Sequence, residues 1–196
     1  MIVKHLLDLR PIMVALAGQN GAGKTTFYKA YLKASGLRFV NADDIARDLR
    51  ADVYAAARMA DTLRRELLAQ RESFIFETVF SDPVGDKVTF LKEAERSGYT
   101  IVLLFIGTKG PEISDERVAM RVLKGGHDVP ADKLKERYPR VMRNLQRALI
   151  EISNVRVYDN SDLRDPYRLV ATKEDGQILQ MHGSTPDWLR RLLSLA

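Results

Sequence analysis

The sequence predicts an α/β fold, in which a parallel five-stranded sheet carries helices on both faces. Strand-like and helix-like segments alternate five times along the chain, and such alternation is typical of parallel sheets with crossover helices. The strand-like segments are short apolar runs rich in β-branched and aromatic residues, as expected for strands that are buried on both faces. They cover residues 12–17, 37–40, 73–76, 100–106 and 155–158.

Helical patterns fill the intervals between these strands. They cover residues 24–35, 53–70, 87–97, 112–123 and 131–152. Gly36 and Gly98 directly follow the first and third of them, and glycine commonly ends a helix because it adopts the left-handed conformation without strain. In residues 53–70 the apolar side chains recur at helical spacing, so one face of this helix should pack against the sheet.

The last part of the chain predicts a β-hairpin and a short helix. Residues 167–173 and 177–182 flank Asp175-Gly176, and Asp-Gly is a common hairpin turn. Pro186 then precedes a helical pattern over residues 188–195, consistent with the preference of proline for helix starts.

Length and composition are those of an ordinary globular domain. The chain has 196 residues, of which 45% are hydrophobic and 29% charged, enough to bury a core. No repeat, linker or low-complexity tract divides it, so we expect a single domain over residues 1–196, with the hairpin and helix at about 165–196. The chain contains no cysteine, which excludes disulfides and thiolate metal sites.

Charged residues interrupt the apolar stretch near the N-terminus. Lys4, His5, Asp8 and Arg10 break the segment that could otherwise form the apolar region of a signal peptide. No other stretch approaches the roughly 20 apolar residues that a membrane helix requires. We therefore expect a cytoplasmic protein that does not associate with membranes.

A glycine-rich octapeptide follows the first predicted strand. Residues 18–25 read GQNGAGKT and match G-x-x-x-x-G-K-[ST], the phosphate-binding loop or P-loop. Its glycines let backbone N–H groups turn toward phosphates, Lys24 supplies a positive charge for the β- and γ-phosphates, and the Thr25 hydroxyl is a ligand for Mg²⁺. The loop therefore predicts binding of ATP with Mg²⁺. The predicted nucleotide contacts within it are Asn20, Gly21, Ala22, Gly23, Lys24, Thr25 and Thr26.

Two other classes of P-loop protein find no support in the sequence. A GTPase should carry an Asn-Lys-x-Asp guanine-recognition motif after a late strand, but residues 107–110 read GTKG. A transporter-type ATPase should carry a Ser-Gly-Gly signature and an apolar strand that ends in Asp-Glu, and neither occurs. Chain length and a basic segment favour a small-molecule kinase, which requires a phosphate cradle, an acid near the acceptor and arginines on a mobile lid.

Acidic residues follow the second and third predicted strands. Because ligands of parallel α/β sheets bind at the carboxyl ends of strands, Asp43 and Glu77 are expected beside the P-loop. Asp43 is predicted to orient or deprotonate the acceptor hydroxyl, and Glu77 to bind the acceptor or Mg²⁺, with Thr78 as a further acceptor contact. The alternatives are that Asp43 or Asp44 caps the following helix and that Glu77 is a solvated strand end.

Positive charge is concentrated in one segment. The net charge is +5, and residues 117–147 alone carry nine Lys or Arg and three Asp or Glu, a net charge of +6. Arg117 and Arg121 lie four residues apart and share a helix face, and Gly125-Gly126 permits a hinge before the next helix. This pattern predicts a phosphate-binding lid at about residues 112–150.

The lid arginines are predicted to contact the triphosphate and the acceptor. Guanidinium groups that a closing lid brings in meet the charge that develops on the transferring phosphoryl group, a catalytic role assigned first to Arg121. The alternative is a solvated pair of basic helices. A nucleic-acid interface is disfavoured because Tyr138 is the only aromatic residue between Arg117 and Arg147, so bases would lack a stacking platform.

With these residues assembled, the chain resembles the zeta-toxin-like kinases, a P-loop family, over about residues 14–162. GGHDVP within the lid is similar to a shorter branch of that family. The resemblance rests on AGQNGAGKTT, FVNADDIA, FIFET followed by Phe80-Ser81, ERVAMRVLKGGHDVP with ERY and NL after it, and VYDNS.

The resemblance implies ATP-dependent phosphorylation of a hydroxyl group on a small metabolite, which in the toxins is a UDP-activated amino sugar. It implies that Asp43 is the catalytic aspartate and that Glu77 binds the acceptor. The lid arginines of the family correspond to Arg121 and to either Arg117 or Arg137. In related kinases adenine binds between the lid helix and the loop after the last core strand, here near Asn160-Ser161.

Departures from the family pattern leave the acceptor open. The chain is shorter than typical toxins, lacks most of their additional substrate-binding segments and has a different lid spacing, so toxicity and an antitoxin partner are not carried over. Two rival hypotheses remain at this stage. One is a toxin module that a protein antitoxin holds inactive, and the other is an ATP-binding protein that associates with nucleic acid through its basic segment.

Overall fold

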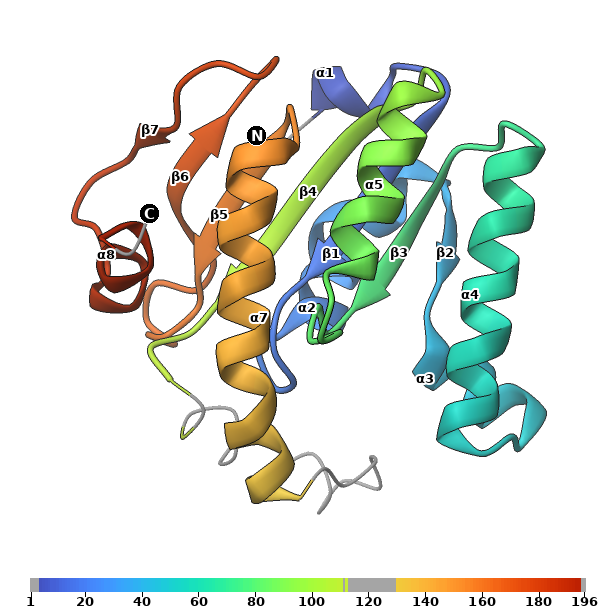
Figure 1. The fold of residues 1–196 in the computed structure, drawn as a ribbon, viewed down its shortest axis with the longest axis horizontal. Helices are drawn as coiled ribbons and strands as arrows, with labels where there is room; N and C mark the ends of the chain where they lie inside the picture. Colours follow the sequence, from blue (N-terminus) through green and yellow to red (C-terminus); the bar gives the residue numbers. More distant parts are fainter. Residues whose placement is uncertain (1–3, 111, 113–129, 195–196) are drawn as a thin grey trace.

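The computed structural model describes residues 4–110, 112 and 130–194, and a sheet of seven strands forms its centre (Figure 1). The strand order is β2-β3-β1-β4-β5-β6-β7. The five strands that the apolar runs predict are confirmed, and they are mutually parallel. They are β1 (Ile12–Ala17), β2 (Arg38–Val40), β3 (Phe74–Thr78), β4 (Thr100–Gly107) and β5 (Val155–Asp159).

The number of strands differs from the prediction of a five-stranded sheet. The C-terminal hairpin, β6 (Arg168–Lys173) and β7 (Gln180–Met181), continues the sheet because β6 pairs antiparallel with β5. Without β6, the outer edge of β5 would expose its backbone N–H and C=O groups. The Asp-Gly turn identifies a hairpin but carries no information about the edge to which the hairpin adds.

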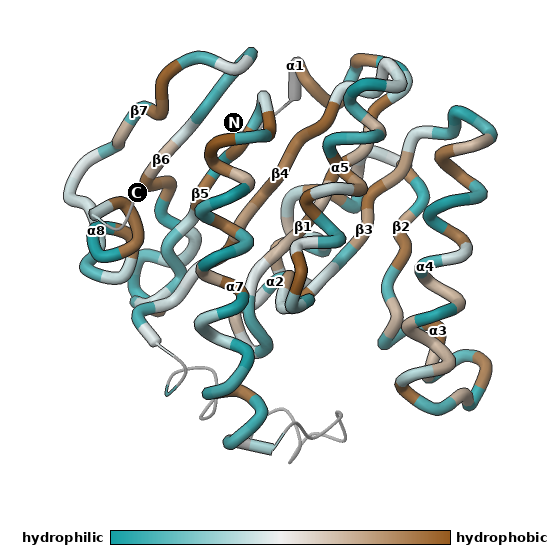
Figure 2. Tube along the Cα trace, in the orientation of Figure 1, coloured by the Kyte–Doolittle hydropathy of each residue, from teal (hydrophilic) through white to brown (hydrophobic). Residues whose placement is uncertain are grey.

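Helices cover both faces of the sheet, as predicted. One face packs against α4 (Val53–Ala69), α5 (Asp86–Arg96), α7 (Ala131–Glu151) and α8 (Asp187–Leu193), and the other against α1 (Lys4–Leu7) and α2 (Lys24–Phe27). Alternate residues of β1, all fully buried, enter the two cores. Figure 2 shows the hydrophobic residues of β1, β3 and β4 between these layers. Among the described helices, none is long and apolar enough to cross a membrane.

Three helical segments differ from the sequence prediction, and one of them is the short helix α1, which was not among the predicted helices. The segment after the P-loop begins as α2, continues as a π-helical turn over Tyr28–Leu32 and a 3-10 turn over Lys33–Ser35, and ends at Gly36 in the left-handed region. A short helix, α3 (Ala42–Leu49), follows β2 and was not among the predicted helices. The predicted helix over 112–123 lies outside the described residues, apart from Glu112.

Candidate functional site

The candidate site lies at the carboxyl ends of β1, β2 and β3, at the lower edge of the sheet in Figure 1. The P-loop follows β1, Glu77 is the fourth residue of β3, and Asn41 directly follows β2. Because β3 pairs with both β1 and β2, Glu77 stands between the P-loop and the start of α3. The second predicted strand is thus one position further from the P-loop than the third.

The backbone of the P-loop depends on glycine at both of its ends. Gly18 has a φ of 141°, and a Cβ atom there would lie 2.2 Å from the backbone oxygen of Ile106. Gly23 has a φ of 95°, and its Cβ would lie 2.7 Å from a side-chain nitrogen of Asn160. Any other residue would strain the backbone and collide with a neighbour, so the glycines of the motif are required by packing as well as by chirality.

Lys24 and Thr25 both meet Glu77. The Thr25 hydroxyl donates to Glu77 Oε2 at 2.9 Å, and Lys24 Nζ lies 3.8 Å from Glu77 Oε1. The buried Lys24 ammonium also donates to the backbone oxygens of Gly18 and Gln19, at 2.9 and 3.0 Å. A cation, a hydroxyl and a carboxylate therefore converge at the start of α2, where the helix dipole also favours an anion.

Asn41 is a site residue that the sequence reasoning missed. Its Oδ1 accepts from the backbone N–H of Asp43 at 2.8 Å and so caps α3, while its Nδ2 donates to Glu77 Oε2 at 3.2 Å. The helix cap is therefore Asn41, and the alternative that Asp43 or Asp44 caps this helix is wrong. The preference of helix N-caps for asparagine is the signal that could have identified it.

Asp43 and Asp44 occupy the first turn of α3 but have different surroundings. Asp44 is paired with Arg47 at 2.7 Å. The exposed Asp43 side chain forms no hydrogen bond or ion pair with the described part of the chain, while its backbone N–H is held by Asn41. Of the two carboxylates, Asp43 is therefore the one available to an incoming group.

The loop after β3 is shaped by internal contacts. The Thr78 hydroxyl accepts from the backbone N–H of Phe80, which is buried and has a left-handed φ of 66°. Asn144 on α7 donates to the backbone oxygens of Phe80 and Asp82, both at 2.9 Å. Thr78 thus takes part in a turn, and α7 holds the loop that follows Glu77.

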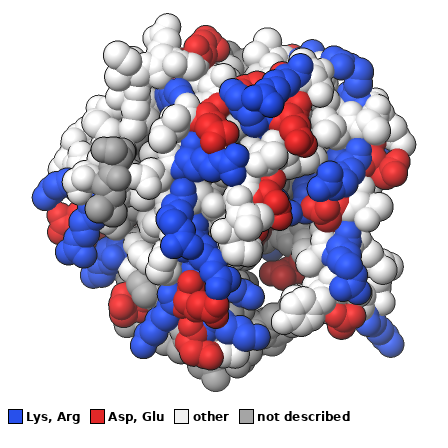
Figure 3. Space-filling view, in the orientation of Figure 1, with Lys and Arg blue, Asp and Glu red and all other residues white. Residues whose placement is uncertain are grey.

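The predicted lid is described only in part. Arg117, Arg121 and the Gly125-Gly126 hinge lie outside the described residues. Arg137 is half-buried on α7, which carries a band of basic side chains along its length (Figure 3). The Arg147 side chain stabilises the folded domain, because it donates to Glu151 at 2.6 Å and to the backbone oxygen of Gly85 at 3.2 Å.

Residues after β5 contact the P-loop directly. Asn160 Nδ2 donates to the backbone oxygen of Ala22 at 2.8 Å, and the Tyr167 hydroxyl donates to that of Gly23 at 3.0 Å. The sequence predicted an adenine contact near Asn160-Ser161 but did not predict that Asn160 would donate a hydrogen bond to the P-loop backbone. From the other side, Gln19 Nε2 donates to the Thr108 hydroxyl after β4 at 2.6 Å.

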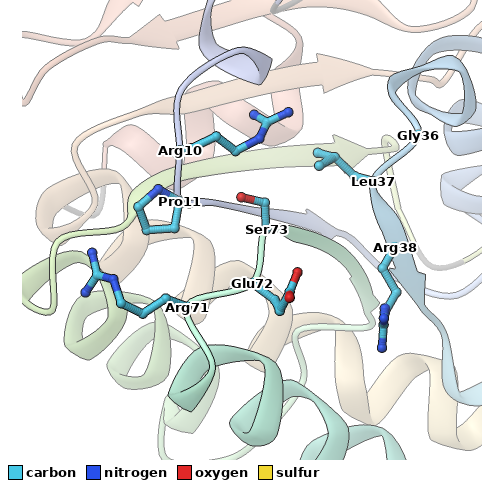
Figure 4. Close-up of a pocket in the computed structure, with 8 residues that line it drawn as sticks. All are labelled: Arg10, Pro11, Gly36, Leu37, Arg38, Arg71, Glu72 and Ser73. Atoms are coloured by element: carbon cyan, nitrogen blue, oxygen red, sulfur yellow. The ribbon is translucent and has the colours of Figure 1, made fainter.

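An open depression of about 600 Å³ lies at the opposite, amino-terminal end of the sheet, away from the P-loop (Figure 4). Arg10, Arg38 and Arg71 surround it, but Figure 4 shows that their guanidinium groups point in different directions. Two of them donate to backbone oxygens, Arg10 to Leu9 at 2.7 Å and Arg71 to Ser97 at 3.1 Å. This depression therefore adds nothing to the candidate site.

A P-loop between β1 and a helix, an acid on the neighbouring strand β3 and the strand order 2-3-1-4-5 define a P-loop kinase fold. The family model for zeta toxin matches residues 4–168. The chain belongs to the zeta toxin family, as its motifs predicted. A relative from Haemophilus influenzae, described as an uncharacterized protein, is 28% identical over 144 residues, which cover 70% of this chain and all of the relative.

Solved structures share the fold at low sequence identity. The complex of AvrRxo1-ORF1 with AvrRxo1-ORF2 and sulphate ions contains a chain that aligns with a TM-score of 0.72 and 17% identity, covering 97% of this chain and 66% of that one. A chain of the AvrRxo1-ORF1 complex with ATP aligns with a TM-score of 0.70 and 18% identity, covering 92% of this chain and 64% of that one. A chain of the PezAT toxin-antitoxin system of Streptococcus pneumoniae aligns with a TM-score of 0.59 and 16% identity, covering 98% of this chain and 92% of that one. The chain thus spans about two thirds of the AvrRxo1-ORF1 complex chain.

Proposed function

We propose that this protein is a kinase that transfers the γ-phosphoryl group of Mg-ATP to a hydroxyl group of a small metabolite, with a nucleotide sugar as the first candidate. The convergence of Lys24, Thr25 and Glu77 carries the proposal. It combines a cradle for phosphates with an acidic group on the strand beside it, as phosphoryl transfer requires. Membership of the zeta toxin family and an AvrRxo1-ORF1 complex with ATP support the choice of reaction and of nucleotide.

The roles of the residues follow from their chemistry. Lys24 and the backbone N–H groups of residues 20–26 bind the phosphates. Asp43, exposed on the first turn of α3, orients the acceptor hydroxyl or takes its proton. Glu77, Thr78 and Arg137 bind the acceptor, and Arg117 and Arg121 neutralise the charge on the transferring group.

The residues present fit a magnesium ion at Thr25. Mg²⁺ prefers oxygen ligands and is usually held by one or two protein groups together with phosphate oxygens and water. The Thr25 hydroxyl provides such a group, and the Glu77 carboxylate, which accepts its hydrogen bond at 2.9 Å, holds it in place. A cluster of three or more His, Cys, Asp or Glu side chains, which the described residues do not contain, is unnecessary for this mode of binding. When bound, the ion would neutralise charge on the β- and γ-phosphates.

The test of the proposal is phosphoryl transfer by the wild type and by Lys24→Ala. Each protein is incubated with Mg-ATP and a metabolite extract, and mass spectrometry searches for a product that is heavier by one HPO₃ unit. We expect the product with the wild type and its loss with Lys24→Ala, because the ammonium group that holds the transferred phosphate is removed. Lys33→Ala, at an exposed lysine in the same helical segment, is the control and should retain activity.

Product formation at the wild-type rate by Lys24→Ala would overturn the proposal. Absence of any product with the wild type, in extracts from several sources, would count against a small-molecule acceptor. The rival hypothesis of a toxin module is favoured by one observation, since PezAT is a toxin-antitoxin system. Growth arrest on expression of the wild type but not of Lys24→Ala would support that hypothesis without changing the reaction.

A further inference from the structure

The connection between β5 and β6 holds the carboxyl end of the P-loop. Its two contacts are made by residues that lie 138 and 144 positions away in sequence from their partners. Asn160 donates to the backbone oxygen of Ala22, and Tyr167 donates to the backbone oxygen of Gly23. These are the last two carbonyl groups before Lys24, so both hydrogen bonds act on the part of the loop that leads into α2.

The connection is itself rigidly built. Asn160 is only 4% exposed, its backbone N–H donates to the backbone oxygen of Gly107 at 2.8 Å, and its Oδ1 accepts from the backbone N–H of Tyr167 at 3.4 Å. The ring of Tyr167 packs edge-on against Phe27 of α2, with ring centroids 5.2 Å apart. The side chains of Asn160 and Tyr167 therefore reach the P-loop from a connection that is held in place by its own contacts.

Asp159, the last residue of β5, links the β5–β6 connection to β6 and α8. Asp159 is buried, and its carboxylate accepts from the Trp188 indole at 3.0 Å and from the Ser161 hydroxyl at 2.5 Å. It also pairs with Arg168 of β6 at 3.2 Å. The C-terminal hairpin and α8, for which sequence reasoning found no role, thus hold the segment from which Asn160 and Tyr167 project.

We infer that Asn160 and Tyr167 are positioning residues that orient two N–H groups of the P-loop toward the phosphates, an inference that rests on the proposed function. A trans peptide is planar, and its C=O and N–H point in opposite directions. A donor on the Ala22 oxygen therefore turns the N–H of Gly23 away from Asn160. A donor on the Gly23 oxygen likewise turns the N–H of Lys24 away from Tyr167.

Loss of either hydrogen bond leaves a peptide plane free to rotate about the flexible backbone at Gly23. The loop then spends part of its time in conformations that cannot bind phosphate, and the apparent affinity for nucleotide falls in proportion to the competent fraction. The N–H groups contact phosphates both before and during transfer, so the KM for ATP should rise while kcat changes little. A residue that only supported the fold would lower stability and leave this affinity unchanged.

Two conservative variants test the inference. Tyr167→Phe removes the hydroxyl but keeps the ring against Phe27, and Asn160→Asp keeps the shape but places a carboxylate against the Ala22 oxygen. Titration calorimetry measures the Kd of Mg-ADP and of a non-hydrolysable ATP analogue, and circular dichroism measures thermal unfolding. We expect Kd to rise about 3- to 10-fold for Tyr167→Phe, as for loss of one hydrogen bond, and at least about 10-fold for Asn160→Asp.

Arg164→Gln is the matched control. It changes the net charge by the same amount as Asn160→Asp, in the same connection, at a side chain that is 91% exposed and pairs with Asp162. Its Kd should equal that of the wild type, which separates a positioning effect from a general charge effect.

If the wild type binds nucleotide and Tyr167→Phe binds it with the same affinity, the inference is overturned. Because Tyr167→Phe is tested independently, this result holds even if Asn160→Asp fails to fold. A decrease in kcat with no change in Kd would also overturn it. A wild type that binds neither nucleotide would overturn both the inference and the proposed function. Nucleotide binding without phosphoryl transfer would overturn the proposed reaction alone.

Discussion

At the residue scale, the site depends on side chains that perform two tasks at once. Asn41 caps α3 and holds Glu77, and Glu77 meets both Lys24 and Thr25. Such shared contacts fix these side chains relative to one another. Asp43 is an exception, because it lies beside this group with an unpaired carboxylate among the described residues.

Asp43→Asn should lower turnover by about 10²- to 10⁴-fold, the range typical of general acid–base catalysis, while the Kd for Mg-ATP stays unchanged. The amide has nearly the same shape but cannot accept a proton from the acceptor. Asp44→Asn is the control, since Asp44 is paired with Arg47 and should tolerate the change. Steady-state rates and calorimetric binding of a non-hydrolysable analogue measure the two effects. Equal losses in both variants would contradict the assignment.

At the element scale, helix starts link the fold to the site. The N-cap of α3 is a site residue, whereas the N-cap of α4 is not. Asp52 accepts from the backbone N–H groups of Tyr54 and Ala55 at 2.9 and 3.1 Å, with no contact to Glu77. This pair of caps allows the contribution of a cap to stability to be separated from its contribution to the site.

Asn41→Ala and Asp52→Ala should each lower the free energy of unfolding by about 1 kcal/mol, as for loss of a helix cap. Only Asn41→Ala should also impair phosphoryl transfer, because it releases the Glu77 carboxylate. Urea denaturation and turnover measurements on both variants make the comparison. If Asp52→Ala lost as much activity as Asn41→Ala, the effect on activity would follow stability, and the contact with Glu77 would be irrelevant.

At the scale of the whole molecule, a charge cluster joins α4 to α5. Asp61 bonds to the buried Arg64 at 2.7 Å, to Arg65 at 3.1 Å and to Lys87 of α5 at 3.2 Å. Burial by itself would raise the pKa of Asp61, but hydrogen bonds from Arg64 and Arg65 and the charge of Lys87 outweigh it and hold the pKa well below its usual range. Stability therefore depends on the ionised form of Asp61.

Asp61→Asn should lower the free energy of unfolding by about 1–3 kcal/mol at neutral pH, because it leaves Arg64 buried without its charged partner. The pKa of Asp61 is lower in the folded than in the unfolded protein, where it is about 4. The stabilisation is thus present above pH 4 and is lost as pH falls toward the folded pKa.

Chemical denaturation of both proteins from about pH 7 to pH 3 tests this sign, because the difference between them should shrink only at the acidic end. Asp48→Asn, in an exposed pair with Arg47, is the control and should show little difference at any pH. A difference that is constant over this range would contradict the role of ionised Asp61.

Local patterns predict much of this fold. The apolar runs locate all five parallel strands, and the Asp-Gly turn locates the hairpin, because strand burial and turn chemistry are properties of short segments. The octapeptide identifies the P-loop for the same reason. The short helix α3 escapes prediction because only eight residues carry its pattern, too few to stand out against the loop around it.

Contiguous motifs identified the family, the P-loop and the acids at the strand ends, because the residues of each motif are close neighbours along the chain. The folded structure was needed to show that Asn41 donates to Glu77, that β6 extends the sheet, and that Asn160 and Tyr167 contact the P-loop. The side-chain contacts join residues 36 to 144 positions apart, and β6 pairs with β5 across 9 to 18 positions. Their partners are chosen by strand order and packing, and no local pattern of side chains carries that information.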